Sequence, residues 1–288
     1  MNAIKHRSDL RPRDVRRRFD RAAGQFHEAD FVHRVTREGL LQRMRPMTNA
    51  ATTVIDLGSA IGAAVPLLEK RFRRARVIAV DFSASMLQVV RSKKVLFSRP
   101  LAVQADARAL PFAAASIDVV FSNLMLPWTD DFDAVFGAVA RVLRKDGLFV
   151  FSTLGPDSLI EIREAWGAID EGEHVNRFPD MHDVGDALVR AGLRDPVLDV
   201  DRLSVSYRSA GALFRDLTAA GARNSLRDRQ RGLTGRQRFR RFTGTFFLAN
   251  EDRSLTLELV YGHCWGSETN RRSGEVAIGA GKIPLRRQ

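Results

Sequence analysis

The stretch TTVIDLGSAIGAAVPLLEKRF, residues 52–72, decides the fold of this chain. It begins with a short apolar strand, continues through a turn from Gly58 to Gly62, and ends in the first turns of a helix. This order is typical of the first strand, loop and helix of an α/β sheet, where the loop and the helix N-terminus hold an adenosine-type ligand. Ala60 stands in the middle of the turn, where such loops usually have a third glycine.

Short apolar strands alternate with helices on the carboxyl side of this stretch. Near-continuous runs of Val, Ile and Phe between helices indicate a parallel sheet covered on both faces. Two later segments alternate as strands, and we expect the last one to run antiparallel at or near the sheet edge. Together these predict an α/β fold with a seven-stranded, mostly parallel sheet: residues 54–58, 76–81, 101–106, 117–123, 147–153, 197–207 and 253–266.

The segments that flank the sheet predict additional helices. Apolar residues near helical spacing predict two helices within residues 12–46, and residues 210–247 read as helical and heavily basic. We therefore expect four parts: an N-terminal helical cap, a main domain, a basic helical lid within that domain, and a loose tail. Their expected bounds are 1–46, 47–266, 210–247 and 267–288.

Composition limits the class of protein and its partners. A hydrophobic fraction of 44% and a charged fraction of 28% are those of an ordinary globular protein. No apolar run approaches the roughly 20 residues that span a bilayer, and the basic N-terminus lacks the apolar core of a secretory signal. The single cysteine, Cys264, fits a reducing cytoplasm. The net charge of +12 favours an acidic partner.

The glycine pattern of the turn distinguishes two adenosine ligands. The dinucleotide pattern G-x-G-x-x-G would have Ala60 and Ala63 in place of two of its three glycines. The S-adenosylmethionine pattern is an acid followed by G-x-G-x-G, which Asp56, Gly58 and Gly62 match and from which only Ala60 departs. The sequence thus favours S-adenosyl-L-methionine.

Polar residues at the ends of the next strands support the same ligand. Asp81 ends the second strand, where a carboxylate can accept hydrogen bonds from both ribose hydroxyls. Phe82 could cover the adenine, while Asp106 and the backbone of Ala107 could reach its edge. Asn123 ends the fourth strand, and Met86 lies one helical turn after Phe82. Asp81 and Asp106 could instead cap helices, and Met86 could serve packing alone.

From Asp56 to about Thr153 the chain resembles the class I S-adenosylmethionine-dependent methyltransferases. Residues 106–166, which open DARALPF and include NLMLPW, are similar to one branch, the malonyl-acyl-carrier-protein O-methyltransferases of biotin synthesis. The resemblance extends over roughly 250 residues and includes four further stretches: FDRAAGQF at 19–26, FPDMHDVGDALVRAGL at 178–193, RGLTGRQRF at 231–239 and LELVYGHCWG at 257–266.

The resemblance implies a Rossmann-like fold and methyl transfer to the free carboxylate of malonyl-acyl-carrier protein, an acidic partner. It assigns the cofactor to Asp56, Gly58, Ser59, Ala60, Gly62, Asp81, Phe82, Met86, Asp106, Ala107 and Asn123. Three positions depart from the family: Ala60 for glycine, Ser59 for the cysteine of many members, and Phe26 for tyrosine.

The substrate carboxylate is already ionised at neutral pH, so we assign no catalytic acid or base and no metal. A carboxylate is best oriented by an arginine. Candidates lie in AAGARNSLRDRQRGLTGRQRFRRF, where eight arginines face one acid, Asp228. The expected substrate contacts are Phe26, Trp128, Arg223, Arg227, Arg231 and Arg238, although Trp128 could equally be a core anchor and most of the arginines a solvated face.

Two alternatives remain open from the sequence. A close relative of this family, the mitochondrial complex I assembly factor, suggests an interaction protein that keeps the methyltransferase scaffold with little or no activity. An RNA-binding protein would fit the basic lid, but the chain has only 2 Tyr and 3 Trp and no aromatic ladder for stacking bases. We therefore expect no nucleic-acid partner.

Overall fold

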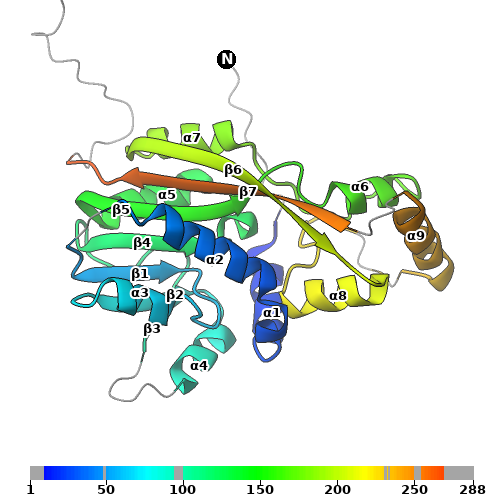
Figure 1. The fold of residues 1–288 in the computed structure, drawn as a ribbon, viewed down its shortest axis with the longest axis horizontal. Coiled ribbons are helices and arrows are strands. Elements are labelled where there is room, and N and C mark those ends of the chain that lie inside the picture. Colours follow the sequence, from blue (N-terminus) through cyan, green and yellow to red (C-terminus); the bar gives the residue numbers. More distant parts are fainter. Residues whose placement is uncertain are drawn as a thin grey trace, which may run out of the picture.

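One twisted sheet of seven strands runs through the molecule (Figure 1). The computed structural model describes residues 10–47, 50–93, 100–229, 232, 234–249 and 254–268. The strands are β1 (Thr53–Leu57), β2 (Arg76–Asp81), β3 (Leu101–Gln104), β4 (Ile117–Asn123), β5 (Leu143–Leu154), β6 (Arg194–Ser206) and β7 (Ser254–Trp265). Their order is β3-β2-β1-β4-β5-β7-β6, and β7 alone runs antiparallel to its neighbours. The prediction of a mostly parallel seven-stranded sheet is confirmed. The antiparallel strand lies one place inside the edge, which β6 occupies.

Alternate residues of each central strand enter two separate cores. Ile55 and Leu57 of β1 belong to one core with helices α5 (Phe132–Val142) and α7 (Met181–Arg190). Val54 belongs to the other core with α2 (Phe31–Arg43), α3 (Val65–Arg71) and α4 (Ala84–Ser92). This alternation follows from the two-residue repeat of a strand, and the helices on both faces explain why the strands are apolar throughout.

The N-terminal segment forms a cap over the carboxyl ends of the parallel strands. It consists of α1 (Pro12–Ala22), the short 3-10 helix η1 (Phe26–Ala29) and α2. Phe19 and Phe26 pack in one apolar cluster with Ile61 and Met86, which follow β1 and β2. Asp20 ties α1 to the start of α4, since it accepts from Ser83 Oγ at 2.6 Å.

Beyond the carboxyl ends of the parallel strands, three more helices pack against one another. These are α6 (Ile160–Gly167), α8 (Ala210–Ala219) and α9 (Arg236–Ala249), and Figure 1 shows them at one end of the molecule. They share a small core built around Trp166, Leu213, Phe242 and Phe246. The expectation that residues 210–247 are helical throughout is wrong for the described part of 220–235. There Gly221 takes φ +68° and ends α8, and the chain then turns back to meet α1.

The predicted tail, 267–288, lies outside the described residues except for Ser267 and Glu268. Within the described chain, no helix combines the length and the apolar character that crossing a membrane requires. The 3-10 helix η2 (Leu126–Trp128), just after β4, completes the elements that surround the site.

Candidate functional site

In the turn after β1, every second residue from 58 to 62 has a left-handed backbone conformation. Gly58, Ala60 and Gly62 have φ values of 74°, 45° and 70°. A Cβ on Gly58 would lie 2.4 Å from the Cβ of Met125, so only glycine fits there. Ala60 has no such obstacle, but its left-handed backbone costs about 1 kcal/mol relative to glycine. The loop keeps its glycine-type geometry in spite of Ala60.

Asp81 organises this loop from the end of β2. Its Oδ2 accepts from the backbone N–H of Ala60 at 2.9 Å, and its Oδ1 accepts from that of Ser83 at 2.8 Å. Burial raises the pKa of Asp81 to about 6, although these hydrogen bonds favour the ionised form. The backbone N–H of Phe82 also favours the ionised form, and since a carboxylate has about four acceptor sites, at least one remains for a further donor such as a hydroxyl.

Asp56, inside β1, is the second buried carboxyl near the loop. It is 2% exposed, and its Oδ2 has no hydrogen-bond partner among the described residues. Burial, with the charge of Asp81, raises its pKa to about 7. Ser59 Oγ is also buried and unpaired within the described chain. Among the described residues, both oxygens therefore lack the partner that a buried polar atom normally has.

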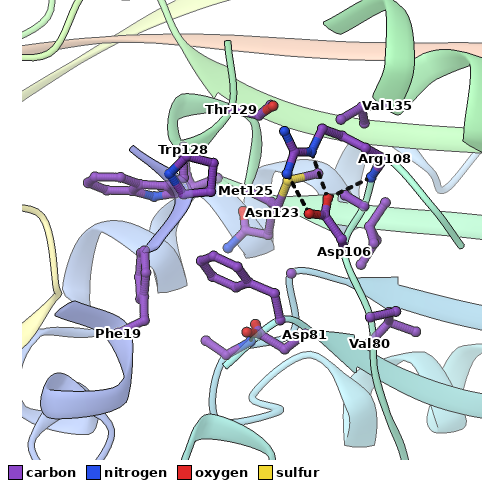
Figure 2. Close-up of a pocket in the computed structure, with 18 of the residues that line it drawn as sticks. Phe19, Val80, Asp81, Asp106, Arg108, Asn123, Met125, Trp128, Thr129 and Val135 are labelled. Atoms are coloured by element: carbon purple, nitrogen blue, oxygen red, sulfur yellow. Dashed lines mark hydrogen bonds and ion pairs between the residues drawn. The ribbon is translucent and has the colours of Figure 1, made fainter. Parts of the chain in front are cut away.

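Asp106 forms an ion pair that the sequence did not lead us to expect. Its Oδ1 accepts from the backbone N–H and Nε of Arg108, both at 3.0 Å, and its Oδ2 accepts from Nη2 at 2.6 Å (Figure 2). This guanidinium holds the pKa of Asp106 below its usual range. The carboxylate is therefore ionised and fixed in direction at the end of β3.

These groups surround a hollow at the carboxyl ends of β1 to β4, which we call the central hollow. Seven of the eleven predicted cofactor residues line it: Gly58, Ala60, Asp81, Phe82, Asp106, Ala107 and Asn123. Asp56, Ser59, Gly62 and Met86 are not among the residues that line it. Met86 is fully buried in the cap cluster, so in this structure it supports the wall by packing.

Aromatic residues close the central hollow on the side of the cap. Phe19 of α1 meets the ring of Trp128 edge-on at 5.1 Å and that of Phe82 at 6.2 Å. Phe26 is 2% exposed and lies 4.9 Å from the ring of His33. These rings give the hollow an apolar roof.

His33 is a site residue that the sequence did not single out. It lines the central hollow, and burial lowers its pKa to about 4, so the ring is neutral at pH 7. Its carbonyl accepts from Asn123 Nδ2 at 2.9 Å, and Asn123 Oδ1 accepts from Ser152 Oγ at 3.0 Å. Asn123 thus fastens α2 to the ends of β4 and β5.

Two further hollows adjoin the central one at Trp128. The first, which we call the apolar hollow, is lined by residues of α2, β6, β7 and α8. It shares His33, Leu124 and Trp128 with the central hollow. The arginine hollow, between α1, α6 and α8, shares only Trp128 with the central hollow and shares Leu154 and Leu159 with the apolar one. Trp128 therefore stands where the three hollows meet, which makes it a wall of the site as well as an anchor.

The four arginines predicted for substrate have different surroundings. Arg223 lines the arginine hollow, and Arg227 is exposed beside it on the same loop. Arg238 is paired with Asp170 and lies 5.9 Å from the Trp166 ring, so its charge is neutralised. Arg231 lies outside the described residues.

Three other arginines line the arginine hollow: Arg17, Arg18 and Arg229. Sequence spacing did not identify Arg18, because it belongs to the run RRRFD on the cap, far from the lid in sequence. Adjacent residues of a helix point in different directions, so Phe19 faces the central hollow while Arg18 faces the arginine hollow, and the sequence offered no signal for Arg18.

Comparisons with known proteins agree with this geometry. Residues 55–151 match the methyltransferase domain family. The malonyl-[acyl-carrier protein] O-methyltransferase of Laribacter hongkongensis is 43% identical over 87% of this chain and 88% of that protein, and the one of Methylovorus sp. is 41% identical over 94% and 93%.

Among solved structures, the YcgJ protein of Bacillus subtilis matches with a TM-score of 0.57 at 17% identity, covering 81% of this chain and 99% of that one. A putative methyltransferase of Bacillus halodurans gives 0.56 at 15% identity, covering 80% and 98%. These two similarities concern the fold alone.

Proposed function

Because the chain belongs to the malonyl-[acyl-carrier protein] O-methyltransferase family, we propose that it methylates the free carboxylate of a malonyl group carried by acyl carrier protein. The cofactor is S-adenosyl-L-methionine, and the reaction is an early step of biotin synthesis. The observation that carries the proposal is the central hollow, in which two strand-end carboxylates and a tight loop stand beside an opening into an apolar space.

The residues of the hollow fit the cofactor. We propose that Asp81 accepts from the ribose, since its carboxylate lines the hollow and keeps an acceptor site beyond its backbone donors. Asp106 and the backbone of Ala107 would hold the adenine edge, with Phe82 beside the ring. The unpaired oxygen of Asp56 suits the cationic methionine end.

The chemistry demands little proton transfer. When bound, S-adenosyl-L-methionine supplies an electrophilic methyl group, and the malonyl carboxylate is already ionised at pH 7. The protein then has to align the carboxylate and keep water out, which Phe19, Phe26 and Trp128 do by covering the hollow. A dry site also favours a reaction in which opposite charges cancel.

The proposed path for the substrate runs past Trp128. The malonyl end would enter beside Trp128 and His33, and the rest of the thioester would lie along Leu154 and Leu159. Arg223 is the predicted arginine whose position supports contact with the substrate, because it lines the adjoining hollow and has no ion pair within the described chain. Arg227 and Arg231 remain proposals for contacts with the carrier.

An acidic carrier protein would dock on α9 and the loop before it. Arg236, Arg240 and Arg241 are exposed and have no ion pair in the part of the chain that the structure describes. Their charge complements an acidic surface. A cytoplasmic location belongs to the same proposal, supported by the single unpaired cysteine, Cys264.

The test is methyl transfer by the purified protein to malonyl-loaded carrier, with acetyl-loaded carrier as the control that lacks the second carboxylate. We expect the methyl ester to form with the malonyl carrier alone. Tight S-adenosylhomocysteine binding without transfer to malonyl carrier would contradict the proposal and favour the assembly-protein alternative.

A further inference from the structure

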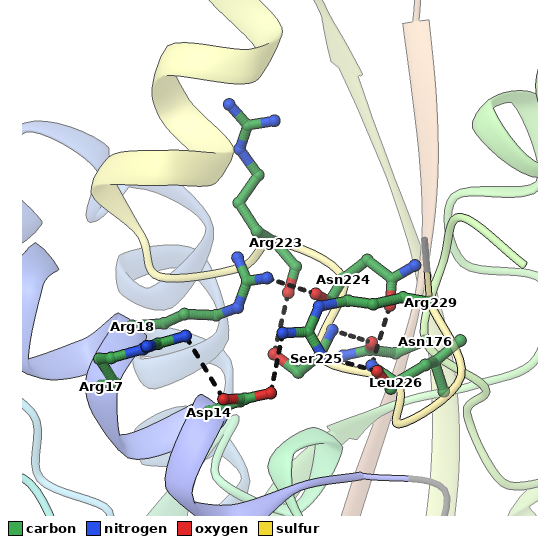
Figure 3. A network of polar contacts seen from close by, with 9 residues as sticks. All are labelled: Asp14, Arg17, Arg18, Asn176, Arg223, Asn224, Ser225, Leu226 and Arg229. Carbon is green, nitrogen blue, oxygen red and sulfur yellow. Dashed lines mark hydrogen bonds and ion pairs between the residues drawn. The ribbon is translucent and has the colours of Figure 1, made fainter. Parts of the chain in front are cut away.

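Two arginines on different elements present uncompensated charge to the arginine hollow. Arg18 comes from α1, and Arg223 from the loop after α8 (Figure 3). Neither forms an ion pair with a carboxylate of the described chain; Arg18 Nη2 donates to the carbonyl of Asn224 at 2.6 Å. Arg223 Nε donates to Thr218 Oγ1 at 2.8 Å, and its guanidinium lies 4.9 Å from the Phe214 ring. Most of their N–H groups remain available for a ligand.

The neighbouring charges are balanced in a different way. Arg229 Nη2 donates to Asp14 Oδ2 at 2.8 Å, and Arg17 is 3.4 Å from the other oxygen of Asp14. The carboxylate of Asp14 thus forms ion pairs with both Arg229 and Arg17. The pKa of Arg18 is lowered to about 10 by burial and by the charges of Arg229 and Arg223, which means that an anion beside Arg18 would relieve repulsion.

The loop that carries Arg223 is held in place by buried polar contacts. The backbone N–H of Ser225 donates to Asn176 Oδ1 at 2.9 Å, and Asn176 is 5% exposed. Leu226 forms an isolated antiparallel bridge with Leu10 at the start of the cap. The two arginines are therefore positioned before any ligand arrives, which reduces the entropy lost on binding.

The proposed substrate offers two anionic groups for this position. One is the malonyl carboxylate, and the other is the phosphodiester that joins the pantetheine arm to the carrier. The reacting carboxylate has to reach the central hollow, which the arginine hollow meets only at Trp128. Neither Arg18 nor Arg223 lines the central hollow. An arginine on the reacting carboxylate would also lower its nucleophilicity.

We propose that Arg18 and Arg223 bind the phosphodiester of the pantetheine arm, while the malonyl end passes Trp128 into the central hollow. This inference rests on the proposed function and names a part of the substrate that the reaction itself does not use. Arginine suits the group because its planar donors match phosphate oxygens. The arm would then be fixed at its charged root and at its reacting tip.

The experiment compares two small thioesters that differ only in this phosphate, malonyl-4′-phosphopantetheine and malonyl-pantetheine. The variants are Arg18→Gln and Arg223→Gln, and the matched control is Arg21→Gln, an exposed arginine of α1 that lines none of the three hollows. We expect wild type and control to show kcat/KM about tenfold or more higher for the phosphorylated thioester, the scale of a hydrogen bond to a charged group. The two variants should lose most of this preference and keep their activity on malonyl-pantetheine.

Binding gives a second readout that needs no catalysis. Wild type should bind 4′-phosphopantetheine more tightly than pantetheine in a calorimetric titration, and each variant should lose the difference. S-adenosylhomocysteine affinity, unchanged in the variants, verifies that they fold.

Two results would overturn the inference: equal loss on both thioesters, which would assign the arginines to the carboxylate, or no phosphate preference in wild type. If wild type methylates no malonyl thioester at all, the proposed function fails instead, and the titrations alone decide whether the phosphate site exists.

Discussion

At the scale of single residues, Ala60 is the position where this chain departs most clearly from its family pattern. Its backbone keeps the left-handed conformation at φ 45°, and its N–H still reaches Asp81 Oδ2. The departure therefore costs conformational strain without undoing the loop. Ala60 also lines the central hollow, so its methyl group takes up space that a glycine would leave to a ligand.

Ala60→Gly should raise the free energy of unfolding by about 1 kcal/mol and tighten S-adenosylhomocysteine binding by less than tenfold. Chemical denaturation and calorimetry measure the two effects. Ala115→Gly is the control, because Ala115 also has a positive φ, of 50°, and lies outside the hollow. It should show the gain in stability alone; weaker ligand binding by Ala60→Gly would contradict this account.

Asp81 should make cofactor binding depend on pH. Its pKa is raised to about 6, and accepting from the ribose requires the ionised form. S-adenosylhomocysteine affinity should therefore rise as pH increases from 5 to 7 and level off above. In Asp81→Asn the affinity should be lower by about tenfold or more and the step near pH 6 should disappear. A pH profile of the same shape in both proteins would exclude Asp81 as its origin.

Asp56 should make the stability of the unliganded protein depend on pH in the opposite direction to a salt-bridged carboxylate. Its pKa rises from an ordinary 3.8 to about 7, so the stabilising contribution is complete below about pH 4 and is lost as pH rises through 7. Relative to wild type, Asp56→Asn should therefore become progressively more stable between pH 5 and 8, as measured by thermal unfolding. A constant difference across that range would mean that Asp56 does not titrate there.

At the scale of elements, the sequence predicted those site residues whose positions follow from the geometry of a parallel sheet. The strand ends meet at one edge, so Asp81, Asp106 and Asn123 could be expected beside one another. The partner of a long arginine side chain does not follow from such a rule. Asp170 neutralises Arg238 from the loop after α6, and Arg18 meets Arg223 from the other end of the chain. The turn between α8 and α9 was also missed, although the sequence offered turn signals there in Gly221, Gly232 and Gly235.

The cap helix α1 should be necessary for both stability and cofactor binding. Phe19 is 8% exposed and contacts Trp128 and Phe82, so Phe19→Ala should lower the free energy of unfolding by about 3 kcal/mol and weaken S-adenosylhomocysteine binding. The control is Phe31→Ala in α2, where the ring is 48% exposed. If both variants lose the same affinity, α1 does not cover the cofactor.

At the scale of the whole molecule, the positive charges behind the net charge of +12 are not equally available to attract a partner. Several arginines are consumed in ion pairs along the surface, such as Arg144 with Asp118 and Arg202 with Asp157. The exposed arginines of α9 have no such partner in the described chain. A long-range attraction for an acidic carrier should therefore be concentrated on that face.

Replacing Arg236, Arg240 and Arg241 with glutamine should lower kcat/KM for malonyl-carrier about tenfold at low salt, with little effect above about 0.5 M salt. Activity on malonyl-pantetheine should not change. The matched control replaces Arg73, Arg74 and Arg76, which are equally exposed at the opposite ends of the strands. An equal loss in the control would mean that total charge, and not the α9 face, attracts the carrier.

The contacts between α1 and the loop after α8 also imply an order of events. Phe19 closes the central hollow, and the next residue back, Arg18, holds the carbonyl of Asn224. The cap cannot swing open for cofactor exchange without releasing the loop that carries Arg223. Turnover should then follow a compulsory sequence, with the cofactor loaded first and the spent cofactor leaving last. Steady-state inhibition by S-adenosylhomocysteine should accordingly be competitive toward the cofactor and noncompetitive toward the malonyl carrier.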